Sequence, residues 1–265
     1  MPWAVEKGEK LPDLKRVLMA GAPVPPSQLE PIRQLLEADA EAFTPYGATE
    51  ALPVASVGAG EILDDTAEAT RGGAGTCVGR PAHGIELAII RISDEPIDTW
   101  SEQLRLPQGE VGEICVKGPV VTHSYHRRSA ATRAAKIREG DAIWHHMGDL
   151  GSVDDRGRVW FAGRKAERVV TADEPLFTDP VEGRYLGRPG VARCALVGVG
   201  ERGGEMPVLV IEGEADASIA KAIVEEGLVR HVLFHKSFPV DVRHNAKIHR
   251  HTLKRWAEKQ LGWKH

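Results

Sequence analysis

The stretch DDRGRVWFAGRKAERVV, residues 154–170, decides how the chain is organised. It opens on the tight-turn signal DDRG, which is followed by the apolar strand pattern RVWFAG and then by a charged segment. A new series of strand and helix patterns begins after this segment. The stretch therefore predicts a boundary near Gly163, between a first domain of residues 1–162 and a second domain of residues 163–265.

Before the boundary, apolar runs of strand length alternate with helix patterns. LKRVLMAG (residues 14–21) predicts a buried strand. SQLEPIRQLLEAD (residues 27–39) predicts a helix that opens with a capping box between Ser27 and Glu30. EICVKG (residues 113–118) and RVWFAG are β-branched and aromatic strand patterns. The first domain is therefore expected to be α/β with a β-rich segment.

Behind the boundary, the pattern is that of a small α+β domain. Strands are predicted for ARCALVGV (192–199), MPVLVIEGE (206–214) and VLFHK (232–236), and helices for ASIAKAIVEEGL (217–228) and TLKRWAEKQL (252–261). No internal repeat or low-complexity tract is visible.

The composition is that of an ordinary globular protein, and its charge is unevenly distributed. Lys plus Arg number 17 against 24 Asp plus Glu in residues 1–162, and 17 against 14 in residues 163–265. Residues 230–265 carry nine cations, two carboxylates and six histidines. Such a basic end suits a nucleic acid, a membrane surface or a polyphosphate, and it also suits a solvated helix face.

The cysteines and the chain start point to a cytoplasmic protein. Cys77, Cys115 and Cys194 are far apart and form no CxxC pair, so they are expected to pack as small hydrophobic side chains. No apolar run is long enough for a transmembrane segment, and MPWAVEKGEK lacks the features of a signal peptide.

The segment YGATE, residues 46–50, combines groups that suit a nucleotide. Tyr46 offers a ring face to a base, Gly47 lets the backbone approach a ligand, Thr49 can donate to a phosphate oxygen, and Glu50 can hold Mg²⁺. No GxxxxGK[ST] loop is present, and the glycine cluster RGGAG at 71–75 contains no lysine. Any nucleotide would therefore be bound without a P-loop of that kind.

Three more residues suit the same ligand. In WHHMGDLG, Asp149 follows a glycine at the end of an apolar run, where a carboxylate can accept from the two hydroxyls of a ribose. Arg164 offers a fork of donors to the ribose or a phosphate. In NAKIHR, Lys247 precedes the last helix and can stabilise charge at a reacting phosphate. A turn aspartate and a surface lysine are the alternatives for two of these residues.

In their order along the chain, these segments resemble the motifs of the adenylate-forming superfamily. That superfamily comprises acyl-CoA synthetases, luciferases and adenylation domains of nonribosomal peptide synthetases. The resembling segments are VLMAGAPVP, YGATE, CVGRPAHGIELAII, GEICVKGPVVTHSY, MGDL, GRKAERVV and NAKIHR, which together span residues 17–250.

The resemblance implies roles for individual residues. Gly21, Ala22 and Pro23 would flank the adenine on one side and Tyr46 and Gly47 on the other, with Asp149 and Arg164 at the ribose. Thr49 would contact the α-phosphate, Glu50 would bind Mg²⁺, and Lys247 would bridge the α-phosphate and the substrate carboxylate. The cofactors implied are ATP and Mg²⁺, and residues 163–265 would be a mobile lid.

The sequence departs from the superfamily pattern in three places. The loop that grips the β- and γ-phosphates and most of the acyl pocket are not in this sequence, so the resemblance implies an incomplete large domain, the C-terminal half of a synthetase, that is inactive alone. Ala166 stands where the superfamily usually has the Asp or Lys of a hinge. The segment VVTADEPLFTDPVEG, residues 169–183, lacks the glycine turn of the acyl-CoA synthetases, which disfavours a thiol acceptor.

Within the superfamily, TPYGATEALPVASV and the segment from Gly163 to Gly183 most resemble the bacterial olefin-pathway β-lactone synthetases. This resemblance implies that a long-chain 2-alkyl-3-hydroxy acid is activated as its acyl-AMP and that its own hydroxyl closes a β-lactone. Coenzyme A would not be needed, and enzymes of the same pathway are possible partners. His145 or His146 is a candidate general base for the hydroxyl.

Other functions remain open. A fatty acyl-CoA synthetase or fatty acyl-AMP ligase would share the first half-reaction, and a non-catalytic nucleotide-binding or interaction module would keep only the half-site. A metal site of His244, His249 and His251 has a spacing that suits no single helix face. Nucleic-acid binding would explain the basic end but none of the upstream motifs, so no nucleic acid is expected as a partner.

Overall fold

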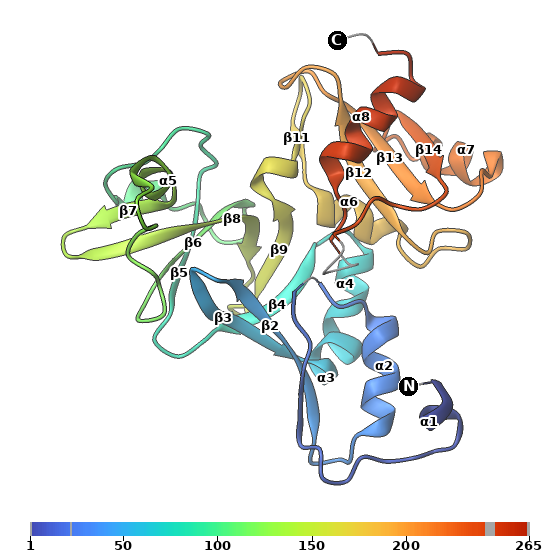
Figure 1. The fold of residues 1–265 in the computed structure, drawn as a ribbon, viewed down its shortest axis with the longest axis horizontal. Coiled ribbons are helices and arrows are strands. Elements are labelled where there is room, and N and C mark those ends of the chain that lie inside the picture. Colours follow the sequence, from blue (N-terminus) through green and yellow to red (C-terminus); the bar gives the residue numbers. More distant parts are fainter. Residues whose placement is uncertain (1, 22, 242–246, 264–265) are drawn as a thin grey trace. The chain divides into compact units, whose positions relative to one another are not determined.

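The computed structural model describes residues 2–21, 23–241 and 247–263 (Figure 1). The chain divides into two compact units. The first consists of Met1–Ala69 and Thr76–Lys165, and the second of Thr70–Gly75 and Ala166–His265. The first unit thus ends at Lys165, whereas the sequence predicted residue 162 as the end of the first domain.

A mixed sheet forms the body of the first unit. Its described strands are β1 (Arg16–Leu18), β2 (Glu41–Ala48), β3 (Ala51–Gly58), β4 (Thr76–Pro81), β5 (Glu86–Ile90), β6 (Gly112–Lys117), β7 (Lys136–Glu139), β8 (Ala142–Val153) and β9 (Val159–Arg164). They run in the order β1-β2-β3-β4-β9-β8-β6-β5, and β7 pairs with β8. β1 is parallel to β2 and the other pairs are antiparallel. The predicted strands over 113–118 and 158–163 are confirmed.

Short helices accompany this sheet. They are α1 (Pro2–Glu6), α2 (Pro26–Leu35), α3 (Ala59–Glu61), the π-helical turn η1 (Ile62–Thr66), α4 (Ala67–Arg71), the 3₁₀ turn η2 (Glu102–Leu104), α5 (Ser129–Ala135) and the 3₁₀ turn η3 (Lys165–Glu167). α2 buries Leu29 and Ile32 against Val57 and Trp160. A separate cluster around Ile114 joins β3, β4, β6, β8 and β9, and this cluster includes Tyr46 at its margin.

Two predictions for the first unit were wrong. β1 is not buried, because it lies at the edge of the sheet with one neighbouring strand, and its Leu18 is 69% exposed. The capping box is also absent: α2 begins at Pro26, its N-cap is Pro25, and no side chain caps it. Proline has no N–H and a preset φ, so Pro26 starts the helix without a cap, and Ser27 already lies inside the first turn.

The second unit contains a small three-stranded sheet covered on both faces. Its strands are β12 (Cys194–Val199), β13 (Met206–Glu212) and β14 (His231–His235), and β10 (Val169–Val170) pairs separately with β11 (Pro175–Leu176). The helices are α6 (Thr178–Tyr185), α7 (Ala217–Glu225) and α8 (Arg250–Gln260). α6 and α7 pack with Leu196 and Leu209 in one cluster, while α8 packs with Val197 and Val208 in another. The predicted small α+β domain is confirmed as a fold.

Buried ionic groups join the helices of the second unit. Arg250, at the start of α8, forms a two-pronged ion pair with Glu182 of α6, with Nη2 2.9 Å from Oε2. Nε of the same guanidinium lies 3.0 Å from Oε2 of Glu167. Neighbouring carboxylates outweigh the effect of burial and raise the pKa of Arg250. α8 is therefore held to α6 by charge as well as by its apolar face.

Candidate functional site

The segment YGATE lies where β2 turns into β3. Tyr46 and Gly47 are in β2, and Thr49 and Glu50 form the turn. The register shifts between Tyr46 and Ala48. A Cβ on Gly47 would lie 2.6 Å from the carbonyl oxygen of Ala51, so only glycine fits this bulge. The side chain of Thr49 is exposed, and that of Glu50 is half-buried.

The structure brings Tyr46, Asp149 and Arg164 together, although they are far apart in the sequence. The hydroxyl of Tyr46 donates to Oδ2 of Asp149 at 2.7 Å, and Nη1 of Arg164 lies 2.9 Å from Oδ1. Asp149 and Arg164 are opposite each other in the β8–β9 ladder. Burial, and then the charge of Asp149, raise the pKa of Tyr46 well above its ordinary value. Tyr46 therefore stays a protonated donor.

Asp149 itself is not at a strand end, as the sequence suggested, but within the long strand β8. Gly148 precedes it with a φ of +67°, a conformation that favours glycine. The ladder with β6 is irregular between Glu113 and Cys115, opposite this point. The aspartate is 4% exposed. An irregular stretch of β8 thus presents a buried carboxylate to Tyr46 and Arg164.

Glu50 is held from two directions by one loop. The hydroxyl of Tyr125 donates to Oε1 of Glu50 at 2.7 Å, and the N–H of Thr122 donates to the Glu50 carbonyl at 2.8 Å. The Tyr125 hydrogen bond is the main reason why the pKa of Glu50 is lowered. Burial, and then Glu50, raise the pKa of Tyr125 to about 12. Glu50 is therefore an ionised, oriented carboxylate, which is the kind of ligand that Mg²⁺ takes beside phosphate oxygens.

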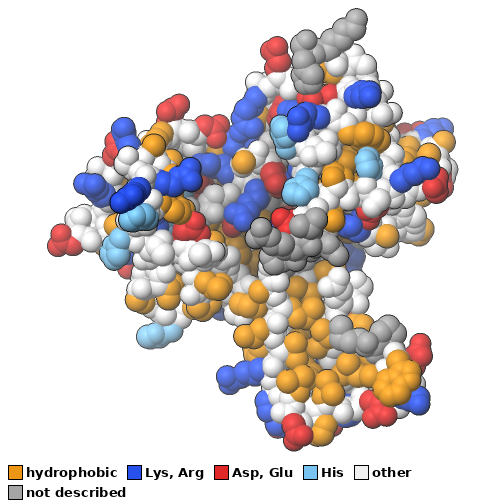
Figure 2. All heavy atoms as spheres, viewed as in Figure 1, with side chains coloured by type: hydrophobic (Ala, Val, Ile, Leu, Met, Phe, Trp, Pro, Cys, Tyr) orange, Lys and Arg blue, Asp and Glu red, His pale blue; other side chains and the backbone are white. Residues whose placement is uncertain are grey.

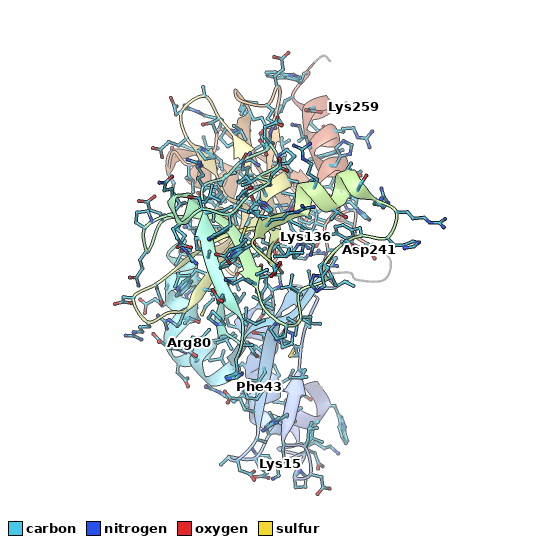
Figure 3. All side chains as sticks on the ribbon, turned by 90° about the vertical axis from the view of Figure 1, so that its left-hand side faces the viewer. Lys15, Phe43, Arg80, Lys136, Asp241 and Lys259 are labelled. Carbon is cyan, nitrogen blue, oxygen red and sulfur yellow. The ribbon has the colours of Figure 1, made fainter. Side chains whose placement is uncertain are left out.

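A buried lysine and a buried histidine lie close to this carboxylate. Lys136 (Figure 3) is 6% exposed, and its Nζ is 3.2 Å from Oγ1 of Thr122. Burial lowers the pKa of Lys136 to about 8, although the charge of Glu50 acts in the opposite direction. Burial, and then Lys136, lower the pKa of His145 to about 4. Near neutral pH, His145 is uncharged, and its Nδ1 lies 3.0 Å from the carbonyl oxygen of Ala135.

The neighbouring His146 has a different environment. Its Nδ1 lies 3.0 Å from Oε1 of Glu113, a fully buried carboxylate that also lies 2.9 Å from Nζ of Lys165. His146 thus belongs to a buried ionic cluster of β6, β8 and Lys165. A general-base role for either histidine stays a hypothesis.

The remaining predicted residues lie elsewhere. Gly21 has a φ of +104° in the bend after β1, Pro23 is exposed, and Ala22 is outside the described residues. Lys247 belongs to the second unit; its side chain is exposed, and its carbonyl accepts from the N–H of Asp241 at 2.9 Å.

Sequence reasoning missed Tyr125 and Lys136. Tyr125 ends the segment GEICVKGPVVTHSY, whose resemblance to the superfamily was noted without a role for the tyrosine.

The cysteines were predicted correctly, since Cys77, Cys115 and Cys194 are free and buried. His244 is outside the described residues. Within the described part of the chain, no group of three His, Cys, Asp or Glu side chains is placed to hold a metal ion.

The fold and the order of the sequence motifs are those of the adenylate-forming superfamily. Residues 2–126 match the family model of the AMP-binding enzymes. The chain belongs to this family.

Two relatives are olefin β-lactone synthetases. The chain is 50% identical over 270 residues to an olefin β-lactone synthetase of Stenotrophomonas maltophilia, covering 96% of this chain and 49% of the relative. It is 48% identical over 271 residues to an olefin β-lactone synthetase of Xanthomonas campestris, again covering 96% and 49%. A feruloyl-CoA synthase of Amycolatopsis is 32% identical over 204 residues, 76% of this chain and 36% of the relative. The chain therefore spans about half the length of the olefin β-lactone synthetases that it matches, namely their C-terminal half.

Solved structures agree with the fold. The amide bond synthetase McbA of Marinactinospora thermotolerans superposes with a TM-score of 0.71 at 25% identity, over 92% of this chain and 47% of that one. O-succinylbenzoate coenzyme A synthetase of Bacillus subtilis, solved with ATP and magnesium ion, gives a TM-score of 0.69 at 24% identity, over 96% and 49%. The predicted fold class is confirmed. Among the described helices, none is long and apolar enough to cross a membrane.

Proposed function

We propose that the protein activates a long-chain 2-alkyl-3-hydroxy acid with ATP and closes it to a β-lactone. The observation that carries the proposal is the meeting of Tyr46, Asp149 and Arg164 at 2.7 and 2.9 Å, in a chain about half identical to two olefin β-lactone synthetases. A buried carboxylate between a phenol and a guanidinium suits the two hydroxyls of a ribose.

In this proposal, the first unit binds the nucleotide. Asp149 accepts from the ribose, and Arg164 orients Asp149 through the 2.9 Å contact with its Oδ1. The hydroxyl of Tyr46 donates a hydrogen bond to Asp149, which fixes the orientation of the ring. The ring can then lie against the adenine, for which the other proposed contacts are Gly21, Ala22, Pro23 and Gly47. Thr49 donates to the α-phosphate from the exposed turn.

Glu50 fits the magnesium role. It is ionised, it is oriented by Tyr125, and a single carboxylate suffices when phosphate oxygens and waters complete the shell. When bound, Mg²⁺ would neutralise charge on the phosphates. Lys247 would do the same for the α-phosphate and the substrate carboxylate, from the second unit, which we propose acts as a lid.

The two half-reactions balance as follows. A carboxylate oxygen of the acid attacks the α-phosphorus of ATP, and the bond to the β-phosphate oxygen breaks, releasing pyrophosphate. The 3-hydroxyl then attacks the acyl carbon, the bond to AMP breaks, and the hydroxyl proton passes to a base. His145 is a candidate for that base, and its pKa of about 4 makes it uncharged but only weakly basic near neutral pH. Tethering the nucleophile removes the entropy cost of a second acceptor.

A coenzyme A ligase is the second candidate, because several relatives, such as the feruloyl-CoA synthase, are named for that activity. Residues 169–176 bear on the choice. They form the hairpin β10–β11, in which Oγ1 of Thr171 donates to the carbonyl of Glu174 at 2.7 Å, and they contain no glycine. This closed hairpin favours an acceptor other than a thiol. A non-catalytic binding module is a third possibility, which the retained Glu50 and Lys247 disfavour.

The deciding experiment uses the natural-length protein, Mg·ATP and a synthetic 2-alkyl-3-hydroxy fatty acid, with and without coenzyme A. We expect a β-lactone and AMP without coenzyme A, detected by NMR and mass spectrometry. Lys247→Ala should slow AMP formation roughly a hundredfold, whereas Lys259→Ala, an exposed cation of α8, should not. A thioester formed only with coenzyme A would establish the ligase. If AMP forms equally well without the acid, and Lys247→Ala does not slow its formation, the proposal that the protein activates this acid is wrong.

A further inference from the structure

A pocket of about 870 Å³ in the first unit is lined by five cations, five residues with hydroxyl groups and one carboxylate. We call it the arginine pocket, and its cations are Arg127, Arg128, Arg133, Lys136 and Arg138. Of its described lining residues, only Asp98 is acidic, and several others carry hydroxyl groups. Figure 2 shows Lys and Arg side chains gathered over the region of α5 and β7. Arg133 belongs to α5, Lys136 and Arg138 belong to β7, and Arg127 and Arg128 directly precede α5.

Most of this charge is not neutralised by the protein. Arg133 is held by Asp98 through two hydrogen bonds of 2.8 and 2.9 Å. Asp98 is also close enough to Arg138 for its pKa to be lowered by that residue. Within the described residues, Arg127 and Arg128 have no carboxylate within ion-pair distance. Asp98 is thus the one acidic lining residue beside five cations, and Glu50, outside the lining, interacts with Lys136.

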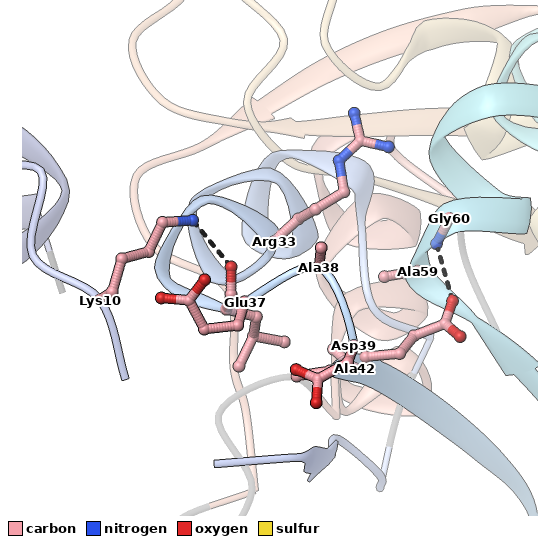
Figure 4. Close-up of a pocket in the computed structure, with 11 residues that line it drawn as sticks. Lys10, Arg33, Glu37, Ala38, Asp39, Ala42, Ala59 and Gly60 are labelled. Carbon is pink, nitrogen blue, oxygen red and sulfur yellow. Dashed lines mark hydrogen bonds between the residues drawn. The ribbon is translucent and has the colours of Figure 1, made fainter. Parts of the chain in front are cut away.

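Another pocket, of about 640 Å³, shows the opposite balance (Figure 4). It lies between α2 and β2. Nζ of Lys10 donates to the carbonyl of Leu36 at 2.8 Å, and Arg33 is paired with Asp64 at 2.8 Å. Its other charged lining residues are acidic. The excess of unneutralised cations is therefore a property of the arginine pocket and not of surface hollows in general.

The loop that carries the arginines is held in shape. Arg127 has a φ of +53°, which is uncommon for a residue other than glycine. Oγ1 of Thr132 accepts from the N–H of Tyr125 at 3.0 Å and donates to the carbonyl of Arg128 at 3.0 Å. This clamp fixes the chain on both sides of Arg127. Donors that are already ordered lose less entropy when an anion binds.

The pocket adjoins Glu50 through two of its own walls. Tyr125 lines the pocket and donates to Glu50, and Lys136 lines it and is electrostatically coupled to Glu50. An anion that is released near Glu50 would therefore lie close to a pocket that carries several cations.

We propose that the arginine pocket binds a phosphate-bearing anion of the pyrophosphate class. Because the pocket adjoins Glu50, we assign as its ligand the pyrophosphate that adenylation releases. This assignment rests on the proposed function. Guanidinium groups bind phosphate oxygens through paired hydrogen bonds, and the pocket's hydroxyl groups supply further donors. The binding itself needs neither ATP nor acid, so it can be tested separately.

The test measures the affinity of the protein for inorganic pyrophosphate by isothermal titration calorimetry at constant ionic strength. The double variant Arg127→Gln/Arg128→Gln should bind about tenfold more weakly or worse, since 1.4 kcal/mol corresponds to a factor of ten. Arg138→Gln should weaken binding to a smaller extent. The matched control, Arg16→Gln/Arg91→Gln, removes the same charge from exposed positions of the same unit and should bind as the unaltered protein does. Circular dichroism checks that all variants are folded.

Three outcomes would overturn the proposal: no binding of pyrophosphate to the unaltered protein, an equal loss in the pocket and control variants, or no loss in either. Vesicles of phosphatidylcholine and phosphatidylglycerol provide the second arm. If they bind while pyrophosphate does not, and the pocket variant abolishes that binding, a membrane surface is the ligand and the proposal is wrong. Adenylation activity is measured in parallel: its absence with intact pyrophosphate binding refutes only the proposed function.

Discussion

Replacing Asp154 with asparagine tests how the DDRG turn stabilises the first unit. Oδ1 of Asp154 accepts from the N–H groups of Arg156 and Arg158 at 3.0 and 2.8 Å. Oδ2 accepts from Nε of Arg158 and Nε1 of Trp160 at 2.7 and 2.9 Å. Burial alone would raise the pKa of Asp154, but the hydrogen bonds from Trp160 and Arg158 outweigh it and lower the pKa from 3.8 to about 2. The folded state therefore favours the charged form.

The shift sets the size and the pH range of the effect. At 1.36 kcal/mol per pKa unit, the ionised carboxylate contributes about 2 kcal/mol to the free energy of unfolding. Because the folded-state pKa is the lower one, this contribution is complete above the unfolded-state value and is lost as the pH falls from about 5 to about 2. Asp154→Asn should therefore lower the free energy of unfolding by about 2 kcal/mol at pH 7, and the melting temperature by roughly 4–8 °C.

The assay is urea unfolding followed by tryptophan fluorescence at pH 7, 5 and 3. The difference between the variant and the unaltered protein should be nearly the same at pH 7 and pH 5, and clearly smaller at pH 3. The control is Asp155→Asn, at the adjacent exposed position, which should change stability by no more than about 0.5 kcal/mol. A loss of the same size at pH 7 and pH 3, or an equal loss in the control, would refute the reasoning.

Two further predictions follow from single contacts. Tyr125→Phe removes the 2.7 Å donor to Glu50 and should raise the Mg²⁺ concentration for half-maximal AMP formation about tenfold, as expected for about 1.5 kcal/mol from a charged hydrogen bond. Manganese binding in the presence of ATP, measured by electron paramagnetic resonance, should weaken in parallel, and unchanged metal binding would contradict the role of Tyr125. Glu182→Gln leaves the guanidinium of Arg250 without its buried partner, and the second unit should lose about 3–5 kcal/mol in urea unfolding; a loss below about 1 kcal/mol would contradict this.

The sequence predicted elements well where local pattern and final environment agree. β12 and β13 are apolar runs that become buried on both faces, so their hydrophobicity alone located them. β1 is the counterexample, because its apolar run looks the same but lies at a sheet edge. The predicted cap of α2 was wrong for a related reason, since the observed N-cap is Pro25, two residues before Ser27, and Pro26 starts the helix.

The candidate site divides in the same way. YGATE, Asp149, Arg164 and Lys247 were found from residue chemistry and from their order along the chain. Tyr125 and Lys136 were not, because nothing in their own neighbourhoods shows that they face Glu50. Tyr125 and Glu50 are 75 positions apart, and the loop after β6 brings them to 2.7 Å.

By itself, the sequence determined the superfamily, the strand-rich first half, the α+β second half and the residue types available for a nucleotide. Those features depend on local periodicity and on the order of short motifs. Both can be recognised in the sequence without knowing which strands pair. Only the tertiary structure decided that the hydroxyl of Tyr46 donates to Asp149 and that Tyr125 orients Glu50. It also decided that five cations line one pocket with a single acidic residue. The physical reason is that hydrogen bonds and burial depend on which strands become neighbours, and that is settled by the packing of the whole sheet.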